Sequence, residues 1–200
     1  MSIHPQQEPN QNIQQQITQR KQKSLTKEIL SWFLTIGAAV VIALLIRTYL
    51  FEPIRVDGES MTDTLVNGEL MLVTKPEYLL GSPSRQDVII CRYPGRKEYF
   101  VKRLIAIPGD TVEIIYDADH GTNIVYVNGE AIDEPYLTPR RNDNDNSMAL
   151  LTLGEDEYFV MGDNRDNSND SRTVGTLHRN QIHGHVRYVF YPFANIRAIP

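Results

Sequence analysis

Two side chains in this sequence could act together as a nucleophile and its base. Ser60 stands in Gly58-Glu59-Ser60-Met61, and Lys102 interrupts the apolar run Tyr99-Phe100-Val101-Lys102-Arg103-Leu104-Ile105. A serine hydroxyl attacks a carbonyl only when a neighbouring base accepts its proton. A lysine can be that base if burial keeps its amine neutral, because desolvation lowers an amine's pKa by up to about 3–5 units. The pair therefore predicts a serine nucleophile with a lysine base.

Residue type alone leaves the role of Lys102 open. A strand lysine commonly turns its ammonium toward water, and this is the structural alternative to a catalytic amine. Histidine is the more usual base, but the five histidines lie at positions 4, 120, 178, 183 and 185, in no context typical of a triad. Ser24-Leu25-Thr26-Lys27 also matches a Ser-x-x-Lys pattern, but it directly precedes an apolar segment and is interpreted as charge flanking a membrane anchor.

That apolar segment, residues 29–46, contains no charged side chain. At ~1.5 Å per residue it spans ~27 Å, and an extension to Phe51 reaches the ~30 Å of a hydrocarbon core. We therefore expect a single transmembrane anchor over residues 29–51. A cleavable signal peptide is the alternative, but small residues should follow such a peptide, whereas Arg47-Thr48-Tyr49 follows here.

The charges beside the anchor predict its orientation. Arg20, Lys21, Lys23 and Lys27 precede it, opposed only by Glu28. Because basic flanks stay in the cytoplasm, we expect residues 1–28 to be a cytoplasmic tail and residues 52–200 to be extracytoplasmic at the plasma membrane. The tail is polar and Gln-rich without hydrophobic periodicity, which indicates disorder. Even a fully extended chain places Ser60 at most ~30 Å from the end of the anchor.

The pattern after the anchor predicts a mainly β ectodomain. Short runs rich in β-branched and aromatic residues, bounded by Gly and Pro, indicate strands over residues 54–56, 70–74, 87–93 and 99–107. Residues 124–132 predict a hairpin with Asn128-Gly129 at its turn. Helical turns are expected only near residues 62–66 and 177–181. The fold class is thus mainly β, with one N-terminal transmembrane helix.

Composition argues against several classes of function. A formal net charge of −5 disfavours nucleic acid binding, which needs a concentrated basic surface. The single cysteine, Cys91, cannot form an internal disulfide, and its apolar strand favours a buried structural thiol over a reactive one. A calcium loop over Asp166, Ser168 and Asp170 is an alternative, but it lacks glycine at its sixth position. We expect no metal and no organic cofactor.

Three motifs resemble the type I (leader) signal peptidases of bacteria. They are the serine motif at 58–61, the lysine motif Val101-Lys102-Arg103-Leu104-Ile105-Ala106-Ile107-Pro108-Gly109-Asp110, and a dodecapeptide from Met161 to Arg172 that begins Met-Gly-Asp-Asn-Arg. They follow the anchor in the family's order, and the resemblance spans about residues 25–198.

The resemblance implies a signal-peptidase-like fold and assigns roles to particular residues. Ser60 would be the acyl-forming nucleophile and Lys102 the general base, and Ser168 would help to hold the lysine amine. Asp163, Asp170 and Arg172 would form a salt-bridged loop beneath the site. The implied substrates are preproteins that carry signal peptides.

Two positions depart from the family's pattern. Asp63 occupies the usual proline position after the nucleophile; because an aspartate can cap a turn, we expect the fold to survive, while its effect on Lys102 stays open. Some members carry a hydroxyl two residues before the nucleophile to stabilise the oxyanion. Here that residue is Gly58, so backbone N–H groups, including that of Ser60, must contribute more.

The resemblance also implies shallow apolar pockets that select small residues before the cut. Six residues are candidate linings, although each is equally suited to the core: Ile54, Val56, Met61, Leu65, Phe100 and Val101. The expected partners are membrane lipid and membrane-inserted preproteins, and the expected oligomeric state is a monomer.

Two other functions fit parts of the pattern. A self-cleaving repressor-type peptidase shares the serine–lysine chemistry, but the anchor occupies the end where its DNA-binding domain would be. A catalytically silent, membrane-tethered binding protein of the same fold is the alternative from another class. The presence of Ser60, Lys102 and Ser168 argues against it, and Asp63 keeps it open.

Overall fold

The computed structural model describes residues 27–46, 51–74, 81–139, 141 and 144–199. The chain divides into two units, one up to residue 47 and one from residue 48 onward, and each is described by itself. In the first unit, Lys27–Ile46 forms a single helix of 20 residues that is long and apolar enough to cross a membrane. Its described side chains are exposed along the whole helix. The predicted tail and the end of the predicted anchor fall largely on residues 1–26 and 47–50, outside the described residues, and Phe51 already belongs to a strand.

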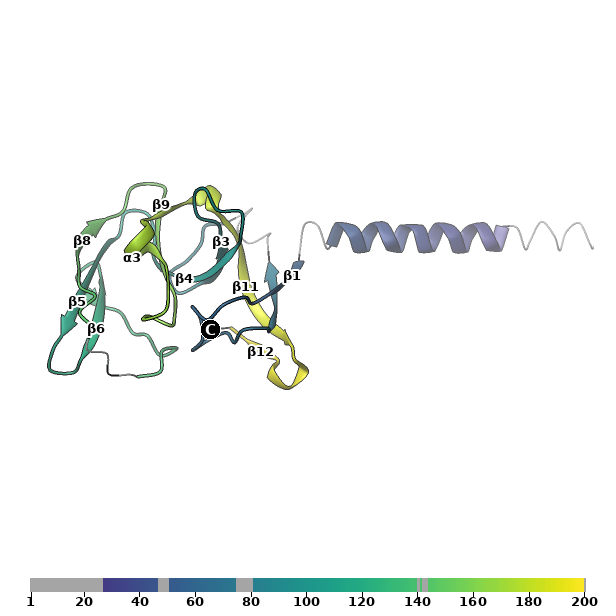
Figure 1. The fold of residues 1–200 in the computed structure, drawn as a ribbon. Helices are drawn as coiled ribbons and strands as arrows, with labels where there is room; N and C mark the ends of the chain where they lie inside the picture. Colours follow the sequence, from purple (N-terminus) through teal and green to yellow (C-terminus); the bar gives the residue numbers. More distant parts are fainter. Residues whose placement is uncertain (1–26, 47–50, 75–80, 140, 142–143, 200) are drawn as a thin grey trace, which may run out of the picture. The chain divides into compact units, whose positions relative to one another are not determined.

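The second unit is built from two antiparallel sheets. Within the described residues, the larger sheet has eight strands, in the order β1-β2-β11-β3-β4-β9-β10 with β12 paired to β11, and the smaller has four, in the order β7-β6-β5-β8. Figure 1 shows β5, β6 and β8 gathered at one side of this unit and β1, β11 and β12 at the other. The predicted mainly β fold is confirmed.

The predicted runs 70–74, 87–93 and 99–107 are strands with similar bounds, and the run 54–56 overlaps a strand that begins three residues earlier. The larger sheet contains β1 (Phe51–Arg55), β2 (Leu70–Thr74), β3 (Val88–Cys91), β4 (Phe100–Ala106), β9 (Glu157–Met161), β10 (Leu177–His178), β11 (Ile182–Tyr191) and β12 (Arg197–Ala198). The smaller sheet contains β5 (Thr111–Asp117), β6 (Thr122–Val127), β7 (Glu130–Ala131) and β8 (Met148–Thr152). The short helices in the described part of this unit are α3 (Ser171–Val174), η1 (Arg179–Gln181) and η2 (Phe193–Asn195). Only η1 falls within a predicted helical turn, so the expectation of turns near residues 62–66 and 177–181 alone was wrong for α3 and η2.

The predicted hairpin is present between β6 and β7. Asn128 and Gly129 link the two strands with φ angles of 55° and 80°. Positive φ at both central residues is the requirement of a type I′ turn, whose twist matches that of the flanking strands.

Strand β3 lies at the centre of the larger sheet and is buried on both faces. Val88 and Ile90 face one apolar cluster, while Ile89 and Cys91 face a second. Cys91 is fully buried, and burial raises the pKa of its thiol to about 12, because a thiolate loses its hydration there. The predicted structural thiol is confirmed.

A third cluster joins the two sheets. Ile105 of β4 and Phe159 of β9 pack against Ile114 of β5 and Val125 of β6. Strand β4 therefore pairs with β3 and β9 within the larger sheet and also packs on the smaller sheet. Side chains on β4 are therefore surrounded by neighbouring strands, and Lys102, which lies on this strand, is buried.

Candidate active site

Ser60 begins a short helical turn after β1, over residues 60–64. We call it the nucleophile turn, after the predicted role of Ser60. The N–H groups of Thr64 and Leu65 donate to the Met61 carbonyl at 2.8 and 2.6 Å. Met61 and Leu65 point into the core beneath the turn, which fixes its orientation. Gly58, two residues before Ser60, has a φ of 101°, a conformation that costs least for glycine.

Lys102 reaches Ser60 from the interior of β4. It pairs with Ile89 of β3 and is 2% exposed. Its Nζ lies 2.7 Å from Oγ of Ser60, which is hydrogen-bond distance. The two predicted residues, far apart in sequence, are therefore in direct contact. With the amine neutral, the serine hydroxyl donates to the nitrogen lone pair, as general-base activation requires.

The surroundings of Lys102 lower its pKa. Burial has the largest effect, because it disfavours the ammonium; the charge of Asp170 opposes it, and that of Arg172 acts with it. Asp170 itself has a lowered pKa: burial would raise it, but hydrogen bonds from Arg172 and from the Gly162 N–H outweigh burial. A carboxylate whose charged form is favoured thus lies near the lysine together with its own cation.

The loop from Gly162 to Arg172 packs directly under Ser60. Asp170 caps α3 and forms an ion pair with Arg172, with Nη2 and Oδ2 2.8 Å apart. A Cβ added at Gly162 would lie 2.3 Å from Oγ of Ser168 and 2.5 Å from the Ser60 carbonyl oxygen. Only glycine fits there. The Asp170 carboxylate accepts hydrogen bonds from Arg172 and from the Gly162 N–H, so its oxygens already have partners. The calcium-loop alternative therefore gains no support.

Ser168 lies beside the pair without touching the lysine amine through a hydrogen bond. Its Oγ is buried and has no hydrogen-bond partner within the described part of the chain. It is close enough to the Asp170 carboxylate to favour the charged form, though not in hydrogen-bond geometry. Support of Lys102 by Ser168 stays a prediction.

Asp163 pairs with a residue that sequence reasoning missed. Arg103, next to Lys102 in β4, is fully buried, and its Nε and Nη2 donate to Oδ1 and Oδ2 of Asp163 at 3.0 and 2.8 Å. Thr64, on the nucleophile turn, donates to the same carboxylate and accepts from Arg103 at 3.2 Å. A second charge inside an apolar strand was the available signal, because a buried guanidinium requires a partner.

A second ion pair connects the segment after β7, which contains Glu134, to the same loop through Arg165. Arg165 donates to Glu134 in a bidentate pair, one bond of which measures 3.0 Å. Tyr136 donates to Glu134 at 2.7 Å, and its ring lies 3.6 Å from the guanidinium carbon of Arg103. The local sequence does not indicate the contacts of Arg165 with Glu134 and of Arg103 with Tyr136, because each joins residues about thirty positions apart.

An apolar cavity of about 270 Å³ opens beside Ser60. Of the six candidate pocket residues, the structure brings together Ile54, Val56, Met61, Phe100 and Val101 around this cavity. Leu65 is instead fully buried in the core below the turn. The rim is charged and includes Arg55, Asp57, Arg96 and Glu98.

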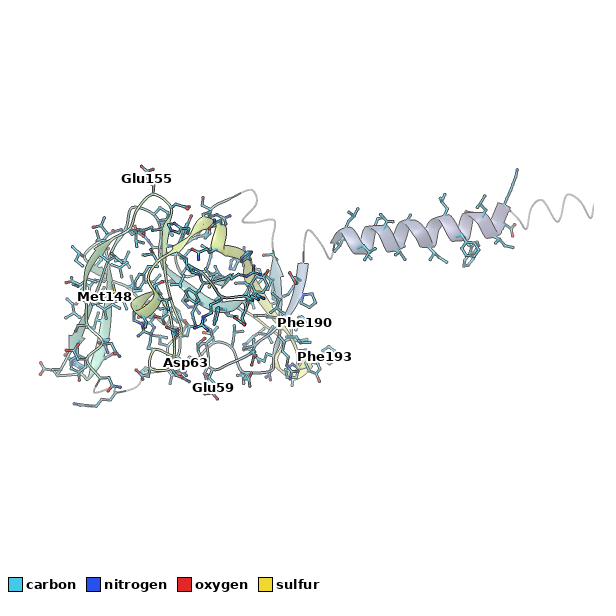
Figure 2. All side chains as sticks on the ribbon, turned by 45° about the horizontal axis from the view of Figure 1, so that its top comes forward. Glu59, Asp63, Met148, Glu155, Phe190 and Phe193 are labelled. Atoms are coloured by element: carbon cyan, nitrogen blue, oxygen red, sulfur yellow. The ribbon has the colours of Figure 1, made fainter. Side chains whose placement is uncertain are left out.

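Asp63 is not among the residues that line this cavity. Its Oδ2 accepts the Thr138 N–H at 3.2 Å, which links the nucleophile turn to the segment that follows Tyr136. Figure 2 labels Asp63 and Glu59 at one edge of the second unit. The Asp63 carboxylate, at the usual proline position, therefore accepts a hydrogen bond from a backbone N–H.

Comparison with known proteins agrees with these features. A family model described as signal peptidase, peptidase S26, matches residues 29–191. The chain is 40% identical to signal peptidase I P of Bacillus subtilis subsp. natto, over 90% of this chain and 98% of that protein. It is also 40% identical to signal peptidase I S of Bacillus subtilis strain 168, over 87% and 95% of the respective chains.

Among solved structures, a signal peptidase I from Enterococcus faecalis V583 shares 32% identity at a TM-score of 0.44, covering 52% of this chain and 96% of that one. The family match covers most of the chain, and the relatives match over nearly their whole length. The chain therefore belongs to the signal peptidase family, peptidase S26, as a type I signal peptidase.

Proposed function

We propose that this signal peptidase cleaves its substrates with Ser60 as nucleophile and Lys102 as general base. One observation carries the assignment: a buried lysine amine lies 2.7 Å from the serine hydroxyl, beside an apolar cavity. The neutral amine accepts the hydroxyl proton while Oγ attacks the scissile carbonyl. The resulting ammonium then gives that proton to the leaving amine, and the acyl-serine is hydrolysed by water that Lys102 deprotonates.

The oxyanion formed in each step needs hydrogen-bond donors. The N–H of Gly58 already donates to Oδ1 of Asn67 at 3.2 Å. We assign the N–H of Ser60 as an oxyanion donor, since Gly58 brings no hydroxyl. Ser168, Asp163, Asp170 and Arg172 would support the reacting pair from behind.

The substrates are preproteins with signal peptides, and we propose that they are cut after small residues. The apolar cavity beside Ser60 supports this specificity, because its lining offers aliphatic and aromatic contacts in a limited volume. An apolar helix that could span a membrane supports a single-pass enzyme at the plasma membrane, with a cytoplasmic N-terminus and an extracytoplasmic catalytic unit. We expect the enzyme to act as a monomer beside lipid, without metal or organic cofactor.

Cleavage of a signal-bearing precursor by the purified full chain tests the assignment. Ser60→Ala and Lys102→Ala should each abolish cleavage while circular dichroism stays that of a folded protein. Because the two residues act as a unit, the double variant should be scarcely slower than either single one. Near-native turnover by a folded Lys102→Ala protein would contradict the lysine base. Absence of cleavage by the unmodified chain would favour the silent binding protein instead.

A further inference from the structure

The C-terminal segment of the chain contacts the turn that carries Ser60. After β11 the chain passes through η2 and returns as β12, where Arg197 pairs with Val189. This return places the Arg197 guanidinium at the end of the nucleophile turn. Its Nη2 donates to the carbonyl oxygen of Thr64 at 2.7 Å.

The same guanidinium binds a buried carboxylate. Nη1 and Nη2 of Arg197 lie 2.8 and 2.7 Å from Oε1 and Oε2 of Glu69, and the Glu69 side chain is only 3% exposed. Glu69 also accepts the Val66 N–H at 3.0 Å and the side-chain amide of Asn195 at 3.1 Å. One carboxylate thus connects the residue after the turn to two residues of the C-terminal segment.

These contacts complete the support of the turn. The last carbonyls of a helical turn have no partner within it, and a cation with N–H donors satisfies them. Thr64 is held at its carbonyl by Arg197 and at its hydroxyl by Arg103 and Asp163. Two separate ion pairs, Arg197 with Glu69 and Arg103 with Asp163, therefore hydrogen-bond to Thr64, which lies four positions after Ser60.

We propose that Arg197 and Glu69 are positioning residues for the nucleophile. They hold the turn so that Oγ of Ser60 stays at hydrogen-bond distance from Nζ of Lys102, and the inference rests on the proposed role of that pair. Neither residue lines the apolar cavity beside Ser60. Their loss should therefore lower kcat and leave KM nearly unchanged, because ground-state binding of substrate is not altered.

The chain offers a matched control in the pair of Arg85 with Asp110. Arg85 donates through Nε and Nη2 at 2.8 and 2.5 Å, with side-chain exposures of 44% for the arginine and 7% for the aspartate. Arg197 is similarly half-exposed over its buried glutamate, at 35% and 3%. The two pairs share geometry and burial, but the Asp110 carboxylate serves Ile107 and Asn128 rather than the nucleophile turn.

The experiment compares Arg197→Met with Arg85→Met in the full chain, by kcat and KM for a signal-bearing precursor and by thermal unfolding. Both variants should lose similar Tm. Only Arg197→Met should lose about tenfold or more in kcat, with KM changed by less than about twofold. Arg197→Lys, which keeps the cation and at least one donor, should recover part of the lost kcat.

Equal kcat in Arg197→Met and Arg85→Met would overturn the proposal, and so would a loss confined to KM. If Arg197→Met does not fold, Arg197→Lys and Glu69→Gln decide, since both must then fall below Arg85→Met in kcat. Ser60→Ala, assayed in parallel, separates the two hypotheses. Cleavage by Ser60→Ala would refute the proposed nucleophile, whereas its inactivity beside an unaffected Arg197→Met would refute only the positioning role.

Discussion

The amine of Lys102 owes its basicity to a balance among its neighbours. Asp170 and Asp163 would each stabilise the ammonium, but Arg172 neutralises the first and Arg103 the second. Because each carboxylate is paired with a guanidinium, the net electrostatic attraction at Nζ is small and burial dominates. With the carboxylates paired, burial has the largest effect and lowers the pKa of Lys102, and the same ion pairs hold the loop together.

A lowered lysine pKa predicts the pH dependence of catalysis. The kcat/KM of the free enzyme should rise with pH through the pKa of Lys102 and reach its plateau below the ordinary lysine range, since only the neutral amine accepts the proton. Asp63→Asn serves as the control and should not move this acidic limb, because the carboxylates that act on the Lys102 amine are those of Asp170 and Asp163. A limb at the ordinary lysine pKa of about 10.4 would contradict the desolvated amine.

The same shift links catalysis to stability. A lysine whose pKa is lower in the folded state binds a proton more readily when unfolded. Folding stability is therefore lost as pH falls below the unfolded pKa, and the loss stops growing at the folded pKa. Over that window, urea unfolding should show the free energy of the unmodified chain falling relative to that of Lys102→Met. Parallel curves for the two proteins would be inconsistent with a shifted pKa.

Among the elements, the buried pair of Arg103 and Asp163 joins β4, the nucleophile turn and the loop after β9. Both side chains are fully buried. Asp163→Asn would leave the guanidinium without its counter-charge, and breaking such a pair costs about 3–5 kcal/mol. Urea unfolding at neutral pH should show that loss of free energy, and replacing both partners with apolar residues should cost less than Asp163→Asn alone. A loss below about 1 kcal/mol would mean that water or another group compensates the charge.

Local pattern predicts the elements well and their long-range partners poorly. The hairpin at Asn128-Gly129 and the strand around Lys102 are encoded by turn chemistry and by β-branched runs, which act over a few residues. Residue types left the contact of Ser60 with Lys102 as one of two possibilities for the lysine, and the family resemblance favoured it. Nothing in the sequence around Glu69 indicates a bond to Arg197, because that contact depends on how β12 pairs with β11.

At the scale of the whole molecule, the two units differ in how much apolar surface they expose. The catalytic unit buries its apolar residues in three clusters, whereas the described helix Lys27–Ile46 exposes large apolar side chains along its length. Exposed apolar surface of that extent is unfavourable in water and is satisfied by a hydrocarbon core. A substrate with its own apolar signal segment would share that environment, which raises the frequency of encounter without any added contact.

The charges beside the apolar helix predict its orientation in the membrane. Arg20, Lys21, Lys23 and Lys27 precede the helix, so the N-terminal side should stay in the cytoplasm. Protease added to intact spheroplasts should then digest the chain beyond residue 52 and spare an epitope within residues 1–20. Permeabilised cells provide the control, because the epitope should be lost there. An epitope digested in intact spheroplasts would reverse the topology and place Ser60 in the cytoplasm, where it could not meet the exported side of a preprotein.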